Sequence, residues 1–210
     1  MEERNIIKSI YNVNLESKVI ENNSNVLAVI LPGIGYTLDR PLLDYSKKLC
    51  LELGFNVLPI EYGFQAARTE FDIEKFNYIL KETMELLKIS LSSNYKKVIF
   101  IGKSIGTVIQ SLLQKMLLEE GADYEFINIY LTPVDKTVEL GIAEDSLVVS
   151  GTCDPLINYD SMNKIDGMKS VKFIKVTGGD HSLNIKGNII KSIEYLMNVI
   201  KSEKNFMEKQ

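Results

Sequence analysis

Short apolar segments rich in Val, Ile and Leu alternate along this chain with longer stretches of helical pattern. The segments lie at residues 26–31, 56–60, 97–101, 126–131, 146–150 and 171–176. Near-continuous apolar runs of this length suit strands covered on both faces, and their alternation with helices is typical of a parallel sheet. The sequence therefore predicts an α/β fold with a mostly parallel central sheet flanked by helices on both faces. We expect a single domain over residues 1–210.

The clearest helical pattern follows the third of these segments. Apolar residues recur there at the three- and four-residue spacing of one helix face: Ile105, Val108, Ile109, Leu112, Leu113, Met116 and Leu117. Further helices are expected at about residues 40–53, 72–87 and 187–200, and the charged residues 201–210 are expected to form a solvated end. Residues 5–21 are expected to add an antiparallel hairpin at one edge of the sheet.

The charge balance and the numbers of cysteine and histidine narrow the function classes. Lys and Arg number 24 against 28 Asp and Glu, and this net charge of -4 disfavours nucleic acid as a partner. Two cysteines and one histidine cannot form a disulfide framework or a Cys/His zinc cluster, so we expect no structural metal. The early apolar run at residues 26–31 is too short for a membrane span. These features predict a cytoplasmic chain.

The segment Gly102-Lys103-Ser104-Ile105-Gly106 joins a predicted strand to the predicted helix that follows it. A sharp strand-to-helix turn strains the backbone of its central residue, and only small residues two positions before and after it fit against the neighbouring elements. Ser104 would project its hydroxyl at the carboxyl edge of the sheet, near the amides at the start of the helix. The pattern predicts a nucleophilic serine, and the alternative is an ordinary tight turn.

Two nucleotide-binding patterns share some of these residues and fail. A phosphate-binding loop that ends at Ser104 needs a glycine at position 97, where Lys97 stands. A dinucleotide-binding fingerprint that starts at Gly33 needs its third glycine at position 38, where Leu38 stands. Both nucleotide-binding interpretations are therefore disfavoured.

A serine nucleophile needs a base, which a histidine oriented by a carboxylate supplies. The single histidine, His181, lies in a glycine-rich segment after the last predicted strand, at the sheet edge where Ser104 is expected. Asp154 follows the strand predicted at residues 146–150 and is the favoured orienting acid, with Asp135 as its rival. We predict a triad of Ser104, Asp154 and His181, and the alternative is a histidine with a structural or surface role.

The order of these three residues along the chain resembles that of the α/β-hydrolase superfamily. The chain also carries LPGIGYT after its first predicted strand, GKSIG at the serine, SGTCDPLI at the acid and GGDHSL at the histidine. The resemblance implies an oxyanion hole formed by the backbone amides of Ile34 and Ile105. Pro32 stands where the family usually has a histidine, so the hydrogen bonds that support this loop are expected to differ.

The resemblance also bears on the substrate site. Residues 132–145 are too few to hold the helical lid that many family members insert at this position, so the chain resembles the small lidless serine esterases and the dienelactone-hydrolase-like group. Tyr62 and Phe64 are candidates to line the substrate site, with the anchors of a surface loop as the alternative. Tyr36 and Lys103 are further candidates for substrate contact.

The resemblance implies hydrolysis of a small-molecule carboxylic ester or thioester through an acyl-enzyme, a reaction that needs no metal and no cofactor. We expect a monomer or a homodimer. An acyltransferase or a peptidase would use the same triad, and a binding protein without catalysis would share the fold. The sequence leaves these alternatives open.

Overall fold

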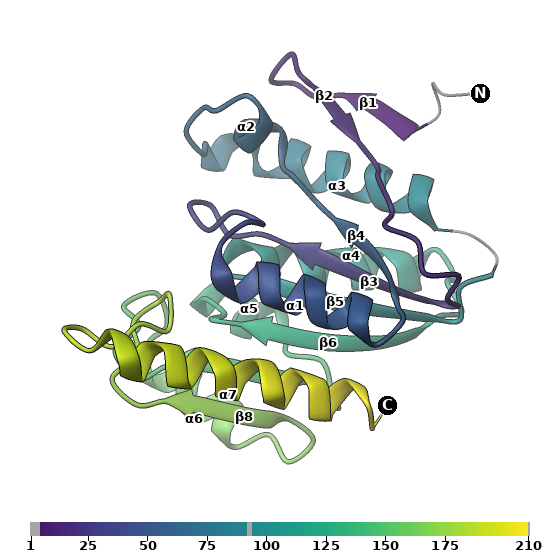
Figure 1. Ribbon diagram of the computed structural model, residues 1–210. Coiled ribbons are helices and arrows are strands. Elements are labelled where there is room, and N and C mark those ends of the chain that lie inside the picture. Colours follow the sequence, from purple (N-terminus) through teal and green to yellow (C-terminus); the bar gives the residue numbers. More distant parts are fainter. Residues whose placement is uncertain (1–4, 92–93, 210) are drawn as a thin grey trace.

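The computed structural model describes residues 5–91 and 94–209, and its centre is a six-stranded parallel sheet (Figure 1). The strands are β3 (Val26–Leu31), β4 (Asn56–Pro59), β5 (Lys97–Lys103), β6 (Glu125–Leu131), β7 (Leu147–Gly151) and β8 (Lys172–Val176). They lie in the order β4-β3-β5-β6-β7-β8, and every neighbouring pair is parallel. Each strand overlaps one predicted segment, so the prediction of a parallel sheet is confirmed.

Helices cover both faces of this sheet (Figure 1). They are α1 (Pro41–Glu52), α2 (Gly63–Ala66), the 3-10 helix η2 (Ile73–Lys75), α3 (Phe76–Ser90), α4 (Ile105–Glu119), α5 (Asp135–Leu140), α6 (Tyr159–Asp166) and α7 (Ile189–Met207). α1 and α7 pack on one face, while α3 and α4 pack on the other. The predicted layering, with helices on both faces, is confirmed.

β3 shows how the apolar runs produce these layers. Its residues from Leu27 to Leu31 are all 0% exposed. Because side chains alternate along a strand, Leu27, Val29 and Leu31 pack toward α3 and α4, while Ala28 and Ile30 pack toward α1 and α7. Burial of one Val, Leu or Ile side chain stabilises a fold by roughly 1.5–3 kcal/mol. A strand with two buried faces therefore needs apolar residues at successive positions.

Two helices differ from their predicted bounds. The helix expected from about residue 72 begins with the 3-10 turn η2, because the Asp72 side chain accepts a hydrogen bond of 3.0 Å from the Glu74 amide. α7 begins at Ile189, after Gly187 turns the chain with a φ of 73° and Asn188 caps the helix. These local caps set the boundaries more sharply than the apolar pattern does.

The C-terminal segment 201–207 is part of α7, so the prediction of a solvated end is wrong for these residues. Phe206 and Met207 are buried in the core beside Val199 and Cys50. Because residues 199, 203, 206 and 207 recur at helical spacing, they share one face of α7. The charged residues between them hid this apolar face in the sequence.

The N-terminal hairpin forms as predicted, but it is not part of the central sheet. β1 (Ile6–Lys8) pairs with β2 (Asn14–Glu16) as a separate antiparallel sheet, which lies next to α3 (Figure 1). Glu82 of α3 accepts hydrogen bonds of 2.8 and 3.0 Å from the hairpin loop. The chain meets the edge of the central sheet further on, where Ile20 bridges to Val57 of β4.

The connection between β6 and β7 holds the short helix α5 rather than a lid subdomain. α5 packs against α4, where the hydroxyls of Thr137 and Thr107 lie 2.6 Å apart. No helix in the described part of the chain is long and apolar enough to cross a membrane.

Candidate active site

Ser104 occupies the sharp turn between β5 and α4. Its φ of 56° and ψ of -120° are strained for a residue with a side chain. The turn is held by two backbone hydrogen bonds, from the Ser104 amide to the Leu131 carbonyl at 3.1 Å and from the Thr107 amide to the Ser104 carbonyl at 2.9 Å. Ser104 therefore lies between a strand and a helix, as the sequence predicts.

The two glycines that flank Ser104 are required by close backbone packing. A Cβ atom on Gly106 would lie 2.3 Å from the Leu31 carbonyl oxygen, and one on Gly102 would lie 2.6 Å from the Gly106 carbonyl oxygen. Both distances are far shorter than any contact that a side chain tolerates. The glycines thus let α4 approach β3 and β5 closely enough to place Ser104 at the edge of the sheet.

Asp154 and His181 lie in two neighbouring loops at the carboxyl ends of β7 and β8. The Asp154 Oδ2 atom lies 2.8 Å from His181 Nδ1, and the second carboxylate oxygen accepts a 2.9 Å hydrogen bond from the Leu156 amide. The Cys153 amide donates to the Gly179 carbonyl at 2.9 Å, which holds the two loops together. The Asp154 side chain is 0% exposed and that of His181 is 22% exposed. A buried carboxylate thus orients a partly accessible imidazole.

The other two aspartates near this edge have different contacts. Asp135, the rival acid, is the first residue of α5 and accepts a 2.9 Å hydrogen bond from the Asn158 amide. Asp180 lies next to His181 in sequence, and it accepts bonds from the Ser182 and Asn184 amides at 2.8 and 2.9 Å. Asp180 is therefore a turn residue, and Asp154 is the acid that contacts the histidine.

The remaining ring nitrogen of the histidine is the one that would face a nucleophile. His181 Nε2 is buried and has no hydrogen-bond partner among the described residues. The structure therefore brings Asp154 and His181 together but does not contain a hydrogen bond between His181 and Ser104. Catalytic hydrogen bonds of this kind are often long before substrate binds and shorten in the reacting complex.

Lys103 is buried inside the protein, which differs from the contact with substrate that was expected for it. It is 0% exposed, and its Nζ atom donates to the Thr132 hydroxyl at 2.7 Å and to the His181 carbonyl at 2.8 Å. Burial lowers the pKa of Lys103 to about 8, and the nearby carboxylates of Asp154 and Asp180 oppose that lowering. The ammonium is thus bound by the protein itself.

No protein-family model and no curated protein sequence matches the chain. Solved structures do match it, among them a candidate α/β hydrolase of unknown function from Agrobacterium tumefaciens, with a TM-score of 0.72 and 17% identity over 97% of this chain and 94% of that one. Est1E from Butyrivibrio proteoclasticus, solved with ferulic acid bound, has a TM-score of 0.71 and 15% identity over 98% of both chains. An α/β serine hydrolase without a lid from Xanthomonas campestris has a TM-score of 0.67 and 12% identity over 97% of this chain and 92% of that one.

The chain has the α/β-hydrolase fold. In this α/β-hydrolase fold the loop after β3 packs against the serine turn, since a Cβ atom on Gly33 would lie 3.2 Å from Ser104 Cβ. The amide of Ile34 in that loop has no acceptor among the described residues. Ile105 is the first residue of α4, so its amide has no acceptor within the helix. Two free amides thus lie on elements that meet at Ser104.

Tyr62 and Gln65 support the loop after β3 through hydrogen bonds to its backbone carbonyls. The Tyr62 hydroxyl donates to the Pro32 carbonyl at 3.2 Å, and Gln65 Nε2 donates to the Gly33 carbonyl at 2.8 Å. Sequence reasoning missed Gln65, because nothing in the sequence places α2 beside a loop some 30 positions earlier. The presence of Pro32 indicated that the hydrogen bonds of this loop would differ, but it did not indicate which residues form them.

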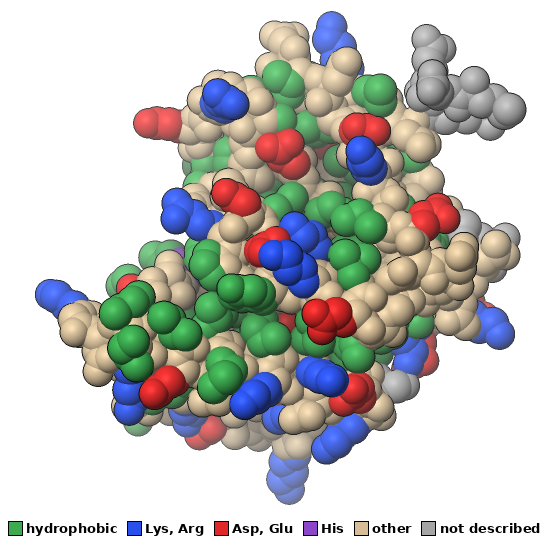
Figure 2. Space-filling model, viewed as in Figure 1, with side chains coloured by type: hydrophobic (Ala, Val, Ile, Leu, Met, Phe, Trp, Pro, Cys, Tyr) green, Lys and Arg blue, Asp and Glu red, His purple; other side chains and the backbone are tan. Residues whose placement is uncertain are grey.

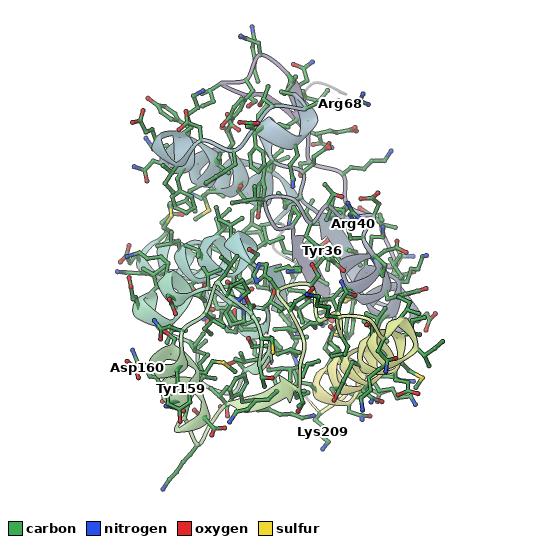
Figure 3. The ribbon with its side chains drawn as sticks, turned by 90° about the vertical axis from the view of Figure 1, so that its left-hand side faces the viewer. Tyr36, Arg40, Arg68, Tyr159, Asp160 and Lys209 are labelled. Carbon is green, nitrogen blue, oxygen red and sulfur yellow. The ribbon has the colours of Figure 1, made fainter. Side chains whose placement is uncertain are left out.

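Tyr62 and Phe64 differ from their expected role as substrate contacts. They are 1% and 3% exposed and stack in the hydrophobic core with ring centres 5.7 Å apart. The alternative, in which they anchor the loop, fits these contacts. Tyr36 is partly exposed and lines a pocket together with Arg40. The two side chains lie close to each other beside α1 (Figure 3).

Proposed function

We propose that this protein is a serine hydrolase that cleaves a carboxylic ester or thioester. The observation that carries the proposal is the 2.8 Å contact of Asp154 with His181, at the sheet edge where the strained turn presents Ser104. A histidine held by a buried carboxylate is the arrangement that activates a serine hydroxyl. The solved structures with the same fold include an esterase from Pyrococcus furiosus, which supports the ester class.

The first half of the reaction forms an acyl-enzyme. His181 Nε2 takes the hydroxyl proton as Ser104 Oγ attacks the carbonyl carbon, and Asp154 stabilises the resulting imidazolium. The amides of Ile34 and Ile105 donate to the oxyanion of the tetrahedral intermediate. When the intermediate collapses, His181 gives its proton to the departing alcohol or thiol.

The second half releases the acid. Water attacks the acyl-enzyme while His181 again accepts a proton, and the imidazolium then returns that proton to Ser104 Oγ as the carboxylic acid leaves. Each step uses a group of this chain at the edge of the sheet. The free His181 Nε2 is the position at which all four proton transfers occur.

Rates of hydrolysis in three proteins test the proposal. We expect Ser104→Ala to lower kcat for p-nitrophenyl acetate and for an acetyl thioester by about 1,000-fold or more relative to the wild type. Asp135→Ala is the matched control, because Asp135 lies near the same edge but has no contact with His181, and it should stay within about twofold. Equal rates for the wild type and Ser104→Ala would contradict the proposal.

A further inference from the structure

A pocket of about 400 Å³ lies beside the candidate active site. One wall comes from the loop after β3 and the start of α1, with Tyr36 and Leu42, and the other from the histidine loop and α7, with Leu183, Ile189 and Ile193. Small-molecule sites typically have volumes of roughly 300–1,000 Å³ and mostly apolar walls. The pocket has the size and the lining of a binding site.

Several apolar side chains on the α7 wall are exposed to solvent. Ile189 is 69% exposed and Ile193 is 55% exposed, and the neighbouring Ile190 and Met197 are 65% and 48% exposed. Figure 2 shows hydrophobic side chains gathered over this part of α7. Arg40 is the one charged residue among those that line the pocket. An apolar ligand would remove the pocket's share of this surface from water, which is favourable.

The pocket adjoins the reacting groups on both sides. Leu183 is two residues from His181, and Tyr36 is two residues from Ile34 of the proposed oxyanion hole. The Tyr36 ring also lies over Lys103, with 4.7 Å from Nζ to the ring centre. Two of the pocket's walls thus belong to the same loops that carry His181 and Ile34.

We propose that this pocket binds the apolar chain of the substrate, so that the preferred substrate is an ester or thioester with a chain of several carbons. This inference rests on the proposed hydrolase function and adds a substrate class to it. A buried methylene in an apolar enzyme pocket changes kcat/KM by about tenfold or more. The wild type is expected to prefer p-nitrophenyl octanoate over the acetate by about tenfold or more in kcat/KM.

Ile193→Asp and Ile190→Asp form a matched pair on α7. Ile193 lines the pocket, whereas Ile190 is also well exposed on the same helix but is not among the residues that line it. Ile193→Asp should lower kcat/KM for the octanoate by about tenfold while changing that for the acetate less than about twofold. Ile190→Asp should leave both values near those of the wild type. An unchanged octanoate rate, or an equal loss for both esters, in Ile193→Asp would overturn the pocket assignment.

A second series of alkyl acetates, from methyl to octyl, shows which side of the ester carries the chain. A dependence of kcat/KM on length in either series supports the pocket, and flat profiles in both series contradict it. Flat profiles with Ser104-dependent hydrolysis of acetate would leave the proposed function intact. Absence of Ser104-dependent hydrolysis would instead remove the proposed function, and with it this inference.

Chain binding without turnover gives an independent readout. Titration of Ser104→Ala with sodium decanoate and with sodium acetate by calorimetry should show binding of decanoate alone. In the Ser104→Ala background, a second substitution Ile193→Asp should weaken decanoate binding about tenfold, and Ile190→Asp should not change it. Equal decanoate binding in all three proteins would contradict the pocket.

Discussion

The ammonium of Lys103 donates a hydrogen bond of 2.8 Å to the backbone carbonyl of His181, although 78 positions separate the two residues in the chain. A second bond of 2.7 Å joins the same ammonium to the Thr132 hydroxyl. Because Lys103 directly precedes Ser104, these contacts link the end of β5, next to the proposed nucleophile, to the loop that carries the proposed base. Lys103 is thus placed to position His181 rather than to bind substrate.

Lys103→Met should separate positioning from substrate binding. The variant removes both donors and leaves the buried carbonyl of His181 without a partner, which costs about 1–3 kcal/mol of unfolding free energy. We expect kcat for p-nitrophenyl acetate to fall about tenfold with little change in KM, because the base is misplaced while the substrate site is kept. Lys115→Met, at a side chain 71% exposed, is the control. A raised KM with an unchanged kcat would instead indicate substrate contact.

Asp154→Asn tests the assignment of the acid. The amide cannot stabilise the imidazolium of His181 and favours the wrong tautomer, so kcat should fall by roughly 100- to 10,000-fold. Asp135→Asn is the matched substitution at the rival residue, and its kcat should stay within about twofold. The measurement is steady-state hydrolysis with thermal unfolding of both variants. A larger loss of kcat in Asp135→Asn would reverse the assignment.

Gly106→Ala tests the packing that shapes the serine turn. The added methyl would meet the Leu31 carbonyl oxygen at 2.3 Å, so α4 must move and the protein should lose about 1–3 kcal/mol of unfolding free energy. Gly35→Ala is the control for stability, since no heavy atom lies within 4 Å of a Cβ at that position. Chemical denaturation of both variants gives the comparison. Equal stability of Gly106→Ala and the wild type would contradict the packing argument.

Glu203 should make stability depend on pH. It lies on α7 and is 0% exposed, and burial raises the pKa of its carboxyl from 4.5 to about 8. Between these two values the folded protein keeps a proton that the unfolded chain has released, so the free energy of unfolding falls as pH rises. The slope is on the order of 1 kcal/mol per pH unit.

Glu203→Gln removes this titrating group and should flatten the profile between pH 4.5 and 8. Glu119→Gln, at a side chain 64% exposed, should keep the wild-type slope. Urea denaturation at several pH values in that window measures both. A Glu203→Gln protein whose slope equals that of the wild type would contradict a raised pKa of Glu203 in the folded protein.

Much of the fold could be predicted because its strands are buried on both faces. A short apolar run such as Val26–Leu31, between longer helical patterns, is typical of a central strand, and the glycines at 102 and 106 fit the turn around Ser104. The buried end of α7 could not be predicted, because Glu203 and its charged neighbours are residue types that usually lie in solvent. Charge in a sequence does not reveal which groups the fold will neutralise and bury.

Some features of the candidate site could likewise be predicted from the sequence, and others could not. Asp154 and His181 could be paired because both follow strands, and the carboxyl ends of parallel strands meet at one edge. The role of Lys103 could not be predicted, because a lysine is seldom fully buried and its partners come from distant loops. The support of Pro32 by Tyr62 likewise depends on contacts across the fold that no local pattern records.

Covalent labelling with a fluorophosphonate probe tests the central claim most directly, because the probe reacts with an activated serine and needs no knowledge of the substrate. The modified peptide is mapped by mass spectrometry in the wild type, Ser104→Ala and His181→Ala. We predict stoichiometric labelling at Ser104 in the wild type and a loss of labelling in both variants. A folded wild-type protein that stays unlabelled at Ser104, or equal labelling in His181→Ala, would contradict a serine activated by the Asp154–His181 pair.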